Sequence, residues 1–376
     1  MEHYFDNSAT TRVCAEAAEA AMHAMLDCYG NPSSTHTKGR EAKKLLDASR
    51  AQVAHALGCK PNELVFTSCG SESDNWALLG AAKAMKRHGK HIISSVVEHD
   101  AVRKTLDELA QRGYDITLLT PDKTGAIPPE AVKNALRDDT ILVSLMLVNN
   151  ETGAVTDISA VSRILKANGS KALLHTDAVQ AFMKLPFTPR TLGADLISIS
   201  GHKIHAPKGI GALYIKDGLR LKPYIMGGSQ ENGRRAGTEA LPAIAAFGAA
   251  SEAAEKGLDE NRARMLGYKL AIIERLQADI PELTYIDTPA PHILSVSLPG
   301  WRSEVLMNAL EATGVYVSKS SACKKGGRSH VLEAIGMPAR TIDGALRIGL
   351  SRFTNDADVD ALCSALKEAH DTLAHR

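Results

Sequence analysis

The chain lacks the features that would draw it to nucleic acid or to a membrane. Its 376 residues carry 44 Lys and Arg against 43 Asp and Glu, so no charge excess attracts a polyanion or an anionic lipid surface. No apolar stretch approaches the length of a membrane span, and the first residues lack the basic and then apolar pattern of a signal peptide. We therefore expect a cytoplasmic protein whose partners are small molecules and other proteins, with no nucleic acid and no membrane among them.

Cysteine is scarce, and its spacing carries no disulfide or metal signature. None of the six cysteines belongs to a C-x-x-C pair or to a cysteine and histidine spacing suited to zinc. We expect neither a disulfide framework nor a metal site. The cysteines are Cys14, Cys28, Cys59, Cys69, Cys323 and Cys363.

What the chain has is enough apolar sequence for a large core, with 44% hydrophobic residues in a length typical of two domains. Short apolar runs alternate with helical patterns such as residues 73–87 and 157–167. Continuous apolar strands between helices are typical of a mostly parallel sheet covered on both faces. We predict an α/β fold with a seven-stranded sheet. Its strands are expected at residues 64–67, 91–97, 116–119, 141–145, 172–176, 196–199 and 210–215.

A second, smaller unit follows a Gly-rich stretch at residues 227–238. A long helical pattern over residues 242–277 leads into it, and strands and helices then mix as in an α+β domain. Its strands are expected at residues 283–286, 293–297 and 346–350, and its helices at 304–312 and 356–373. We expect a large domain over residues 16–254 and a small domain made of residues 1–15 and 255–376.

One lysine directly follows a predicted core strand, in the sequence Ser200-Gly201-His202-Lys203. A lysine held at such a place can be desolvated enough to condense with an aldehyde, whereas a surface lysine stays protonated. The alternative is a lysine that merely ends a strand. The residues that surround Lys203 decide between the two.

A turn suited to phosphate follows the strand at residues 64–67 and opens a helix. The backbone amides of Gly70 and Ser71, together with the Ser71 hydroxyl, face the positive end of that helix. Taken alone, such a turn is more often a simple helix cap.

Three more polar clusters end predicted strands. His99 closes one strand and can stack on a planar ring, although a hydrogen-bonded strand-end histidine is the alternative. Asn150, in the pair Asn149-Asn150, supplies a neutral amide after the most hydrophobic strand. Asp177 ends another strand with Gln180 three residues on, and a buried carboxylate requires a cationic partner.

An amine nucleophile, a phosphate turn, a carboxylate and a ring-stacking histidine together describe a site for pyridoxal 5'-phosphate (PLP). Their order resembles class V of the fold-type I aminotransferase superfamily, and within it the cysteine desulfurases of the nitrogen-fixation and iron–sulfur-cluster assembly group. The resemblance spans nearly the whole chain. It is most specific at residues 72–75, 148–151 and 200–204, and it begins at residues 4–11 and 30–34.

The resemblance implies a role for each residue. Lys203 forms the Schiff base with PLP, Asp177 pairs with the ring nitrogen, and His99 stacks on the ring. Asn150 is also counted among the cofactor residues, and Gln180 contacts the phenolic oxygen. The phosphate is held by Gly70, Ser71, Ser200 and His202, with Thr238 reaching the phosphate of the other subunit in the homodimer typical of the family.

The resemblance also implies where the substrate binds. Asn150 and Arg347 match the positions that bind the substrate carboxylate. The planar fork of an arginine suits that anion because it donates two parallel hydrogen bonds.

Cys323 is the residue that distinguishes a sulfur-transfer enzyme from an aminotransferase. It lies in a polar, Gly-containing segment, residues 317–328, that is typical of a loop. The family pattern there is Ser-Ser-Gly-Ser-Ala-Cys, from which this chain departs at Lys319 and Ser320. Four cations surround the cysteine and are expected to favour its thiolate and to attract an acidic acceptor protein, or else only to solvate the loop. They are Lys319, Lys324, Lys325 and Arg328.

We therefore expect a homodimeric PLP-dependent cysteine desulfurase with Lys203, Cys323 and His99 as catalytic residues. It would convert L-cysteine to L-alanine, leave a persulfide on Cys323, and supply sulfur to an acceptor or scaffold protein for iron–sulfur clusters or thio-cofactors. The alternatives are a selenocysteine lyase, another class V aminotransferase, or a scaffold that keeps the fold without turnover.

Overall fold

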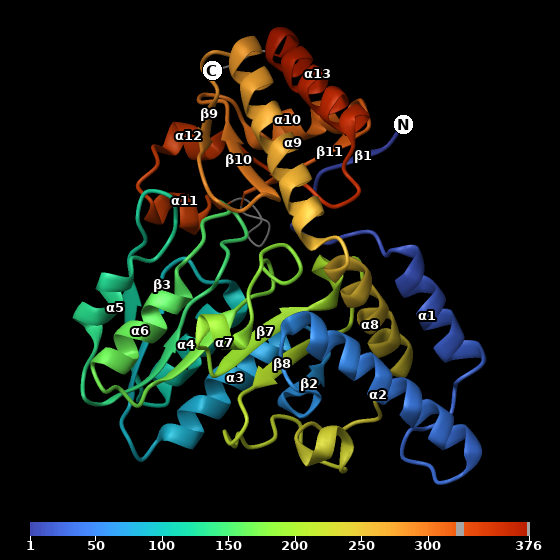
Figure 1. The fold of residues 1–376 in the computed structure, drawn as a ribbon. Helices are drawn as coiled ribbons and strands as arrows, with labels where there is room; N and C mark the ends of the chain where they lie inside the picture. Colours follow the sequence, from blue (N-terminus) through green and yellow to red (C-terminus); the bar gives the residue numbers. More distant parts are fainter. Residues whose placement is uncertain (321–326, 374–376) are drawn as a thin grey trace.

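A seven-stranded sheet forms the larger part of the computed structural model, which describes residues 1–320 and 327–373 (Figure 1). The strand order is β2-β8-β7-β6-β5-β3-β4. Strands β4, β3, β5, β6 and β7 pair in parallel, while β8 is antiparallel to both β7 and β2. The predicted mostly parallel sheet is confirmed. Its strands are β2 (Leu64–Thr67), β3 (His91–Ser95), β4 (Asp115–Leu119), β5 (Thr140–Ser144), β6 (Leu173–Asp177), β7 (Leu196–Ser200) and β8 (Gly211–Ile215).

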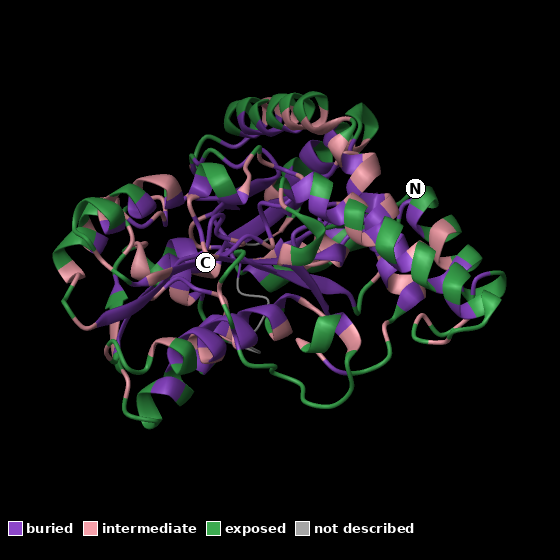
Figure 2. Cartoon of the chain, turned by 60° about the horizontal axis from the view of Figure 1, so that its bottom comes forward, coloured by how far each residue is buried: buried purple, intermediate pink, exposed green. Residues whose placement is uncertain are grey.

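Both faces of this sheet are buried, which explains why its strands are continuously apolar. Side chains alternate between the faces of a strand, and in β2 Phe66 belongs to one core cluster while Val65 belongs to another on the opposite face. Figure 2 shows the buried sheet between helices that are exposed on their outer sides. Strand β4, at the edge, is partly exposed.

Helices cover the sheet on both sides. Helix α3 contacts β5, β6, β7 and β8, while α8 packs against α1 and α2. Helix α3 begins three residues before the predicted helix at 73–87, because the phosphate-type turn is itself its first turn. The helices are α1 (Ala15–Leu26), α2 (Thr37–Leu57), α3 (Gly70–Met85), α4 (Asp100–Gln111), α5 (Pro129–Ala135), α6 (Ile158–Ala167), α7 (Pro189–Leu192) and α8 (Leu241–Glu255).

The C-terminal part of the chain builds a second sheet of four antiparallel strands in the order β12-β13-β10-β9. Its core cluster contains Phe5 together with residues between Met265 and Ala369. The strands are β9 (Thr284–Ile286), β10 (Ile293–Ser297), β12 (Ser318–Lys319) and β13 (Ala345–Gly349). The helices are α9 (Leu258–Asp279), α10 (Ser303–Ala312), α11 (His330–Ala334), α12 (Ala339–Asp343) and α13 (Asp356–Thr372).

The long helix expected over residues 242–277 is wrong as a single element. It is broken between α8 and α9, where Gly257 leaves the helical conformation (φ −120°) and precedes the first residue of α9. Glycine favours such a break because it is a poor helix former. The predicted limits of the two domains stay a prediction.

The N-terminal segment joins the small sheet to the large one. Strand β1 (His3–Tyr4) pairs with β11 (Val315–Tyr316), and the Asn7 amide donates to the Gly349 carbonyl at 2.8 Å. A few residues later, the Thr11 amide donates to the His202 carbonyl at 3.0 Å. Residues 3–11 therefore run from β13 to the turn that carries Lys203. In the part of the chain described, no helix has the length and apolarity needed to cross a membrane.

Candidate active site

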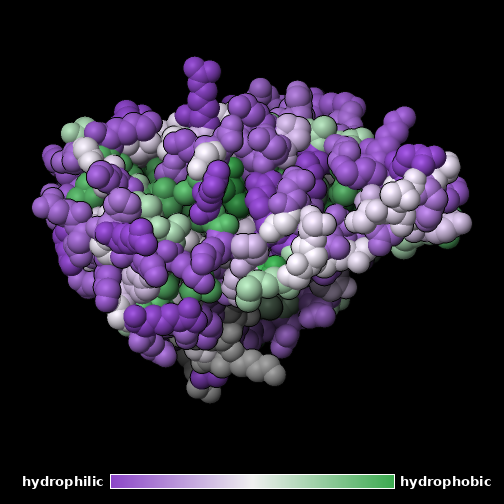
Figure 3. Space-filling model, turned by 90° about the horizontal axis from the view of Figure 1, so that it is seen from below, coloured by the Kyte–Doolittle hydropathy of each residue, from purple (hydrophilic) through white to green (hydrophobic). Residues whose placement is uncertain are grey.

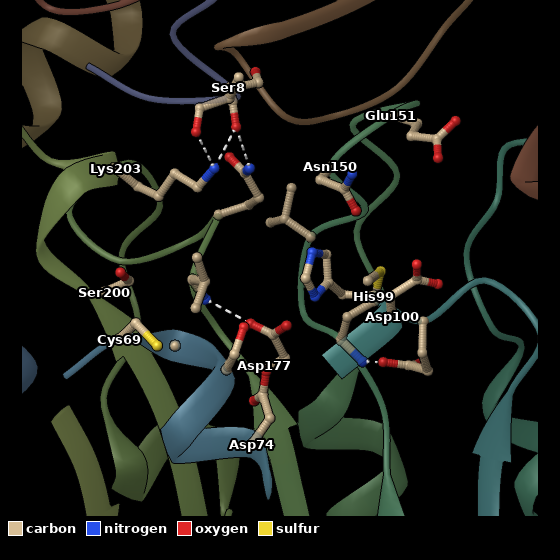
Figure 4. Close-up of a pocket in the computed structure, with 18 of the residues that line it drawn as sticks. Ser8, Cys69, Asp74, His99, Asp100, Asn150, Glu151, Asp177, Ser200 and Lys203 are labelled. Carbon is tan, nitrogen blue, oxygen red and sulfur yellow. Dashed lines mark hydrogen bonds between the residues drawn. The ribbon is translucent and has the colours of Figure 1, made fainter. Parts of the chain in front are cut away.

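A pocket of about 350 Å³ opens where the carboxyl ends of the sheet strands meet the small unit (Figure 4). This is the edge at which α/β sheets bind ligands, and the volume suits a small molecule. The pocket brings together most of the residues predicted from the sequence. They are Gly70, Ser71, His99, Asn150, Asp177, Gln180, Ser200, His202, Lys203 and Arg347.

Lys203 ends a short 3-10 helix, Gly201–Lys203, that begins directly after β7. Its Nζ donates to the carbonyl oxygens of Ser8 and Ala9 at 2.6 and 2.7 Å. Figure 4 shows the lysine extended across the pocket toward this N-terminal segment. Ser8 and Ala9 were not predicted as site residues, although the resemblance at residues 4–11 was a signal for them.

The first turn of α3 forms one wall of the pocket. A Cβ atom on Gly70 would lie 2.8 Å from Val179 Cγ2, so this close approach leaves no room for a side chain. The Ser200 hydroxyl is buried and has no hydrogen-bond partner among the described residues. Burial, followed by the charge of Lys203, lowers the pKa of His202 to about 4. A neutral imidazole and an unpaired hydroxyl beside a helix N-terminus fit a phosphate group.

Asp177 ends β6, where one carboxylate oxygen accepts from the Val179 amide at 2.9 Å. Burial raises the pKa of Asp177, and it raises that of the neighbouring Asp74 much further above its ordinary value. The positive charge of Lys203 opposes this effect at Asp177, whereas no cation of the described residues does so at Asp74. We infer that Asp74 takes up a proton first and that Asp177 is the charged carboxylate of the pair. A protonated ring nitrogen is the partner that such a carboxylate requires.

Asp74 and Glu98 line the same pocket but were not predicted from the sequence. Glu98 accepts from the Ser95 hydroxyl and the Met146 amide, and burial raises its pKa to about 8. His175 lies 3.6 Å from Asp74, and burial lowers its pKa to about 3, so these two groups do not form an ion pair. The only signals in the sequence were their positions next to Glu72-Ser73 and His99.

His99 does not close a strand as expected. Strand β3 ends at Ser95, since the Glu98 carboxylate ties the following turn to Ser95 and Met146. His99 instead precedes α4, where its Nδ1 accepts from the Ala101 amide at 3.1 Å. Its ring still faces the pocket above Asp177 (Figure 4).

Arg347, on β13, is a buried cation that lines the pocket. It is 2% exposed, and its two terminal nitrogens donate to the Asn150 carbonyl at 3.0 Å and to Asp6 at 3.1 Å. Its Nε is buried with no hydrogen-bond partner in residues 1–320 or 327–373. The guanidinium is thus oriented in the pocket with donor capacity left for an anion.

Three predicted site residues remain: Gln180, Thr238 and Cys323. Gln180 donates through Nε2 to the Ser8 carbonyl at 2.8 Å, while its buried Oε1 has no hydrogen-bond partner in the described part of the chain. Thr238 is exposed and does not line the pocket of its own chain. Cys323 lies outside the described residues. The roles of all three stay predictions.

The effect of the four cations around the cysteine stays a prediction, although two of them pair with carboxylates. Lys319 pairs with Glu304 at 3.2 Å, and Arg328 makes two bonds to Asp343 at 2.7 and 2.8 Å. These carboxylates offset two of the four charges. Lys324 and Lys325 lie outside the described residues.

The fold and the site agree with the comparisons. A model of the aminotransferase class V family matches residues 3–362, and the chain belongs to that family. Its members use PLP, so the predicted family, fold class and cofactor are confirmed.

More specifically, the chain belongs to the cysteine desulfurases of this family. It is 41% identical to "Cysteine desulfurase IscS" of Methanosarcina thermophila over 97% of this chain and 91% of that protein. A solved "NifS-like protein" superposes with a TM-score of 0.94 and 36% identity, covering 99% of this chain and all of that one. A solved "SspA in complex with cysteine" has a TM-score of 0.80 and 30% identity, covering 94% of this chain and all of that one.

Proposed function

We propose that the chain is a PLP-dependent cysteine desulfurase that converts L-cysteine to L-alanine and leaves a persulfide on Cys323. The observation that carries the proposal is that an amine, a carboxylate and a guanidinium line one pocket, in the form of Lys203, Asp177 and Arg347. Family membership supports the same reaction.

The residues of the pocket fit the cofactor. PLP, when bound, supplies the electron sink for breaking bonds at the substrate Cα. Lys203 would hold its aldehyde carbon, Asp177 would pair with its ring nitrogen, and His99 would stack on its ring. Gly70, Ser71, Ser200 and His202 would bind its phosphate, and the most direct structural support is the Ser200 hydroxyl, which is buried with no hydrogen-bond partner among the described residues.

The substrate is oriented by its carboxylate. Arg347 and Asn150 bind that group, and Lys203 then moves the Cα proton as a general base. The Cys323 thiolate attacks the substrate sulfur, so that the Cβ–S bond breaks and an S–S bond forms. The proton lost from the Cys323 thiol is matched by the proton that the Cβ atom of alanine gains. The two sulfurs are oxidised as the carbon is reduced, and the step needs no external oxidant.

Selenocysteine cleavage and transamination need the same pocket, and they are the alternative reactions. The solved SspA holds cysteine, and the curated relative is named for desulfuration, which favours the sulfur substrate. A scaffold without turnover is disfavoured because it has no use for the convergence of Lys203, Asp177 and Arg347.

The proposal includes a cytoplasmic homodimer that passes sulfur to an acceptor or scaffold protein. Because Thr238 is exposed and away from the pocket of its own chain, the phosphate contact implied by the family requires a second chain. Large hydrophobic side chains such as Met22, Met25 and Met226 are exposed. Hydrophobic patches also reach the surface on the face seen from below in Figure 3. Light scattering tests the dimer, and reduced PLP affinity in Thr238→Ala tests the contact.

The reaction is tested with purified protein, PLP and L-cysteine in the presence of a thiol reductant. We expect alanine and sulfide in equal amounts, and Cys323→Ser is expected to bind PLP without releasing sulfide. Alanine formation without sulfide would contradict the proposal. Selenocysteine turnover with no cysteine turnover would favour the lyase alternative.

A further inference from the structure

A buried carboxylate connects a turn of the large unit to the beginning of α11. The Ser329 hydroxyl donates to Glu151 Oε2, and the two residues are 178 positions apart in the chain. Both are buried, with Glu151 5% and Ser329 2% exposed. Figure 4 shows Glu151 on the far side of Asn150 from Lys203, with its carboxylate directed away from the lysine. This carboxylate is therefore placed to hold another part of the chain rather than the cofactor.

The turn that carries Glu151, residues 149–153, is itself fixed by hydrogen bonds. The Asn149 side chain accepts from the Glu151 amide at 2.9 Å. The carbonyl of the neighbouring Asn150 accepts from Arg347 at 3.0 Å. Because its backbone is held in this way, Glu151 offers an acceptor in a defined position.

Ser329 is the N-cap of α11. Its hydroxyl accepts from the Leu332 amide at 3.0 Å while it donates to Glu151, so the single donor of the hydroxyl is used. Val331 belongs to the main core cluster of the large unit, whereas Leu332 packs with residues of β9 and β13. The beginning of α11 is thus packed against both units.

Ser329 directly follows the cysteine segment, residues 317–328. Arg328, the last residue of that segment, lines the main pocket and pairs with Asp343 on α12. The end of the segment is therefore held at two successive residues. Asp343 ties it to the small unit, and Glu151 ties it to the turn that carries Asn150, a residue of the proposed substrate site.

The contact is made in surroundings that are unfavourable for a charge. Burial raises the pKa of Glu151 to about 7, although the bond from Ser329 and the charge of Arg347 oppose that effect. A hydrogen bond offsets part of the cost of burying a carboxylate. A carboxyl group accepts a hydrogen bond in either protonation state, so the contact with Ser329 does not depend on the charge of Glu151.

We propose that Glu151 is a positioning residue for sulfur transfer: its contact with Ser329 fixes the end of the cysteine segment against the turn that carries Asn150. In the proposed reaction sulfur passes from bound cysteine to Cys323, and such a step is sensitive to small displacements of the reacting groups. The inference rests on the proposed function, because it concerns the step at Cys323.

The kinetic test replaces each side of the contact in the full chain with PLP bound. Glu151→Ala and Ser329→Ala are each expected to lower kcat about tenfold, the fold-change for a lost hydrogen bond to a charged group, with KM for cysteine and PLP affinity unchanged. Glu151→Gln keeps an acceptor and Ser329→Thr keeps a hydroxyl, so both should retain the wild-type kcat. Asp157→Ala removes an exposed cap at the start of α6 and should leave kcat unchanged.

The double variant of Glu151→Ala with Ser329→Ala distinguishes one shared contact from two independent effects. If a single contact is lost, kcat should remain about tenfold below wild type, whereas independent effects would multiply to about a hundredfold. A hundredfold fall, or a raised KM with an unchanged kcat, would overturn the inference. A lowered urea midpoint with wild-type kcat would also overturn it, because Glu151 would then have only a structural role.

Hydrogen exchange gives a readout that does not depend on turnover. Peptides that cover residues 327–334 are expected to exchange faster in Glu151→Ala than in the wild type, and at the wild-type rate in Glu151→Gln. Unchanged exchange in an active desulfurase would overturn the inference alone. Faster exchange in Glu151→Ala, in a protein whose wild type has no desulfurase activity, would contradict the proposed function and leave the contact between Glu151 and Ser329 standing.

Discussion

The two sides of the pocket are built in different ways. On the sheet side, Asp177 and Lys203 follow neighbouring parallel strands, and the topology alone brings them together. On the small-unit side, Arg347 reaches the pocket through contacts with Asp6 and Asn150, hundreds of residues away in the chain. In the proposed function, the sheet side holds the cofactor and the other side binds the substrate. Substitutions on the sheet side should therefore abolish the reaction, and substitutions on the small-unit side should weaken substrate binding.

Replacement of the sheet-side lysine should have the largest effect. Lys203→Ala is expected to lower the desulfurase rate at least about 1,000-fold, because no other lysine of the described residues lines the pocket. Borohydride reduction followed by peptide mass spectrometry measures the covalent adduct. An adduct retained in the variant would show that another residue holds the cofactor.

Asp177→Asn should keep the shape of the site and lose its charge. We expect PLP to remain bound through the phosphate contacts while the rate falls roughly 100-fold, since the ring nitrogen loses the carboxylate that keeps it protonated. Asp115→Asn, on the exposed edge strand β4, is the matched control. Wild-type turnover in Asp177→Asn would show that the Asp177 carboxylate has only a structural role.

On the substrate side, Arg347→Ala is expected to raise KM for cysteine by a factor of about 10 to 100, the value of a charged hydrogen-bonded pair. The visible cofactor spectrum should not change, because Arg347 does not hold PLP. Steady-state kinetics and absorbance together make the test, with the exposed Arg137→Ala as control. If the spectrum changed and KM did not, the two sides of the pocket would not be separate.

The buried Glu98 should make stability depend on pH. Its pKa is raised by burial from 4.5 to about 8, so between these values the folded protein holds a proton that the unfolded chain has lost. The stabilisation is complete below pH 4.5 and is lost as the pH rises toward 8, by at most about 1.4 kcal/mol per pH unit. Urea unfolding between pH 5 and 8 should show that slope reduced in Glu98→Gln, relative to the exposed control Glu130→Gln. Equal slopes would mean that Glu98 is ionised when folded.

The smallest effect is expected at the cysteine segment. The double substitution Lys324→Glu and Lys325→Glu should slow persulfide formation or transfer about two- to threefold, and more at low salt, because it reverses two charges next to Cys323 in the sequence. Stopped-flow measurement at two ionic strengths checks it. A rate that does not depend on salt would show that these two lysines contribute to solvation only.

The sequence predicted the sheet well because burial on both faces produces continuous apolar strands. It failed where a local feature overrides the pattern, as at Gly257, which divides α8 from α9. Helices α1 and α2 were not predicted, although α2 buries Leu46, Val53 and Leu57 against the core.

The candidate site was predictable only as far as motifs follow strands. Asp177 and Lys203 do so, whereas Ser8 enters the site through a tertiary contact that no spacing encodes. The spacing also did not predict that Glu304 and Asp343 pair with Lys319 and Arg328, each 15 residues away in the chain.

The central claim is that sulfur passes from cysteine to Cys323 in this pocket. The most direct test is a single turnover with sulfur-labelled L-cysteine and no reductant, followed by alanine quantitation and mass spectrometry of the peptides. We predict one alanine for each PLP site and one labelled sulfur atom on the peptide that contains Cys323. The claim would be contradicted by labelled sulfur on Cys14, Cys28, Cys59, Cys69 or Cys363 instead, or by alanine formation at the wild-type rate in Cys323→Ser.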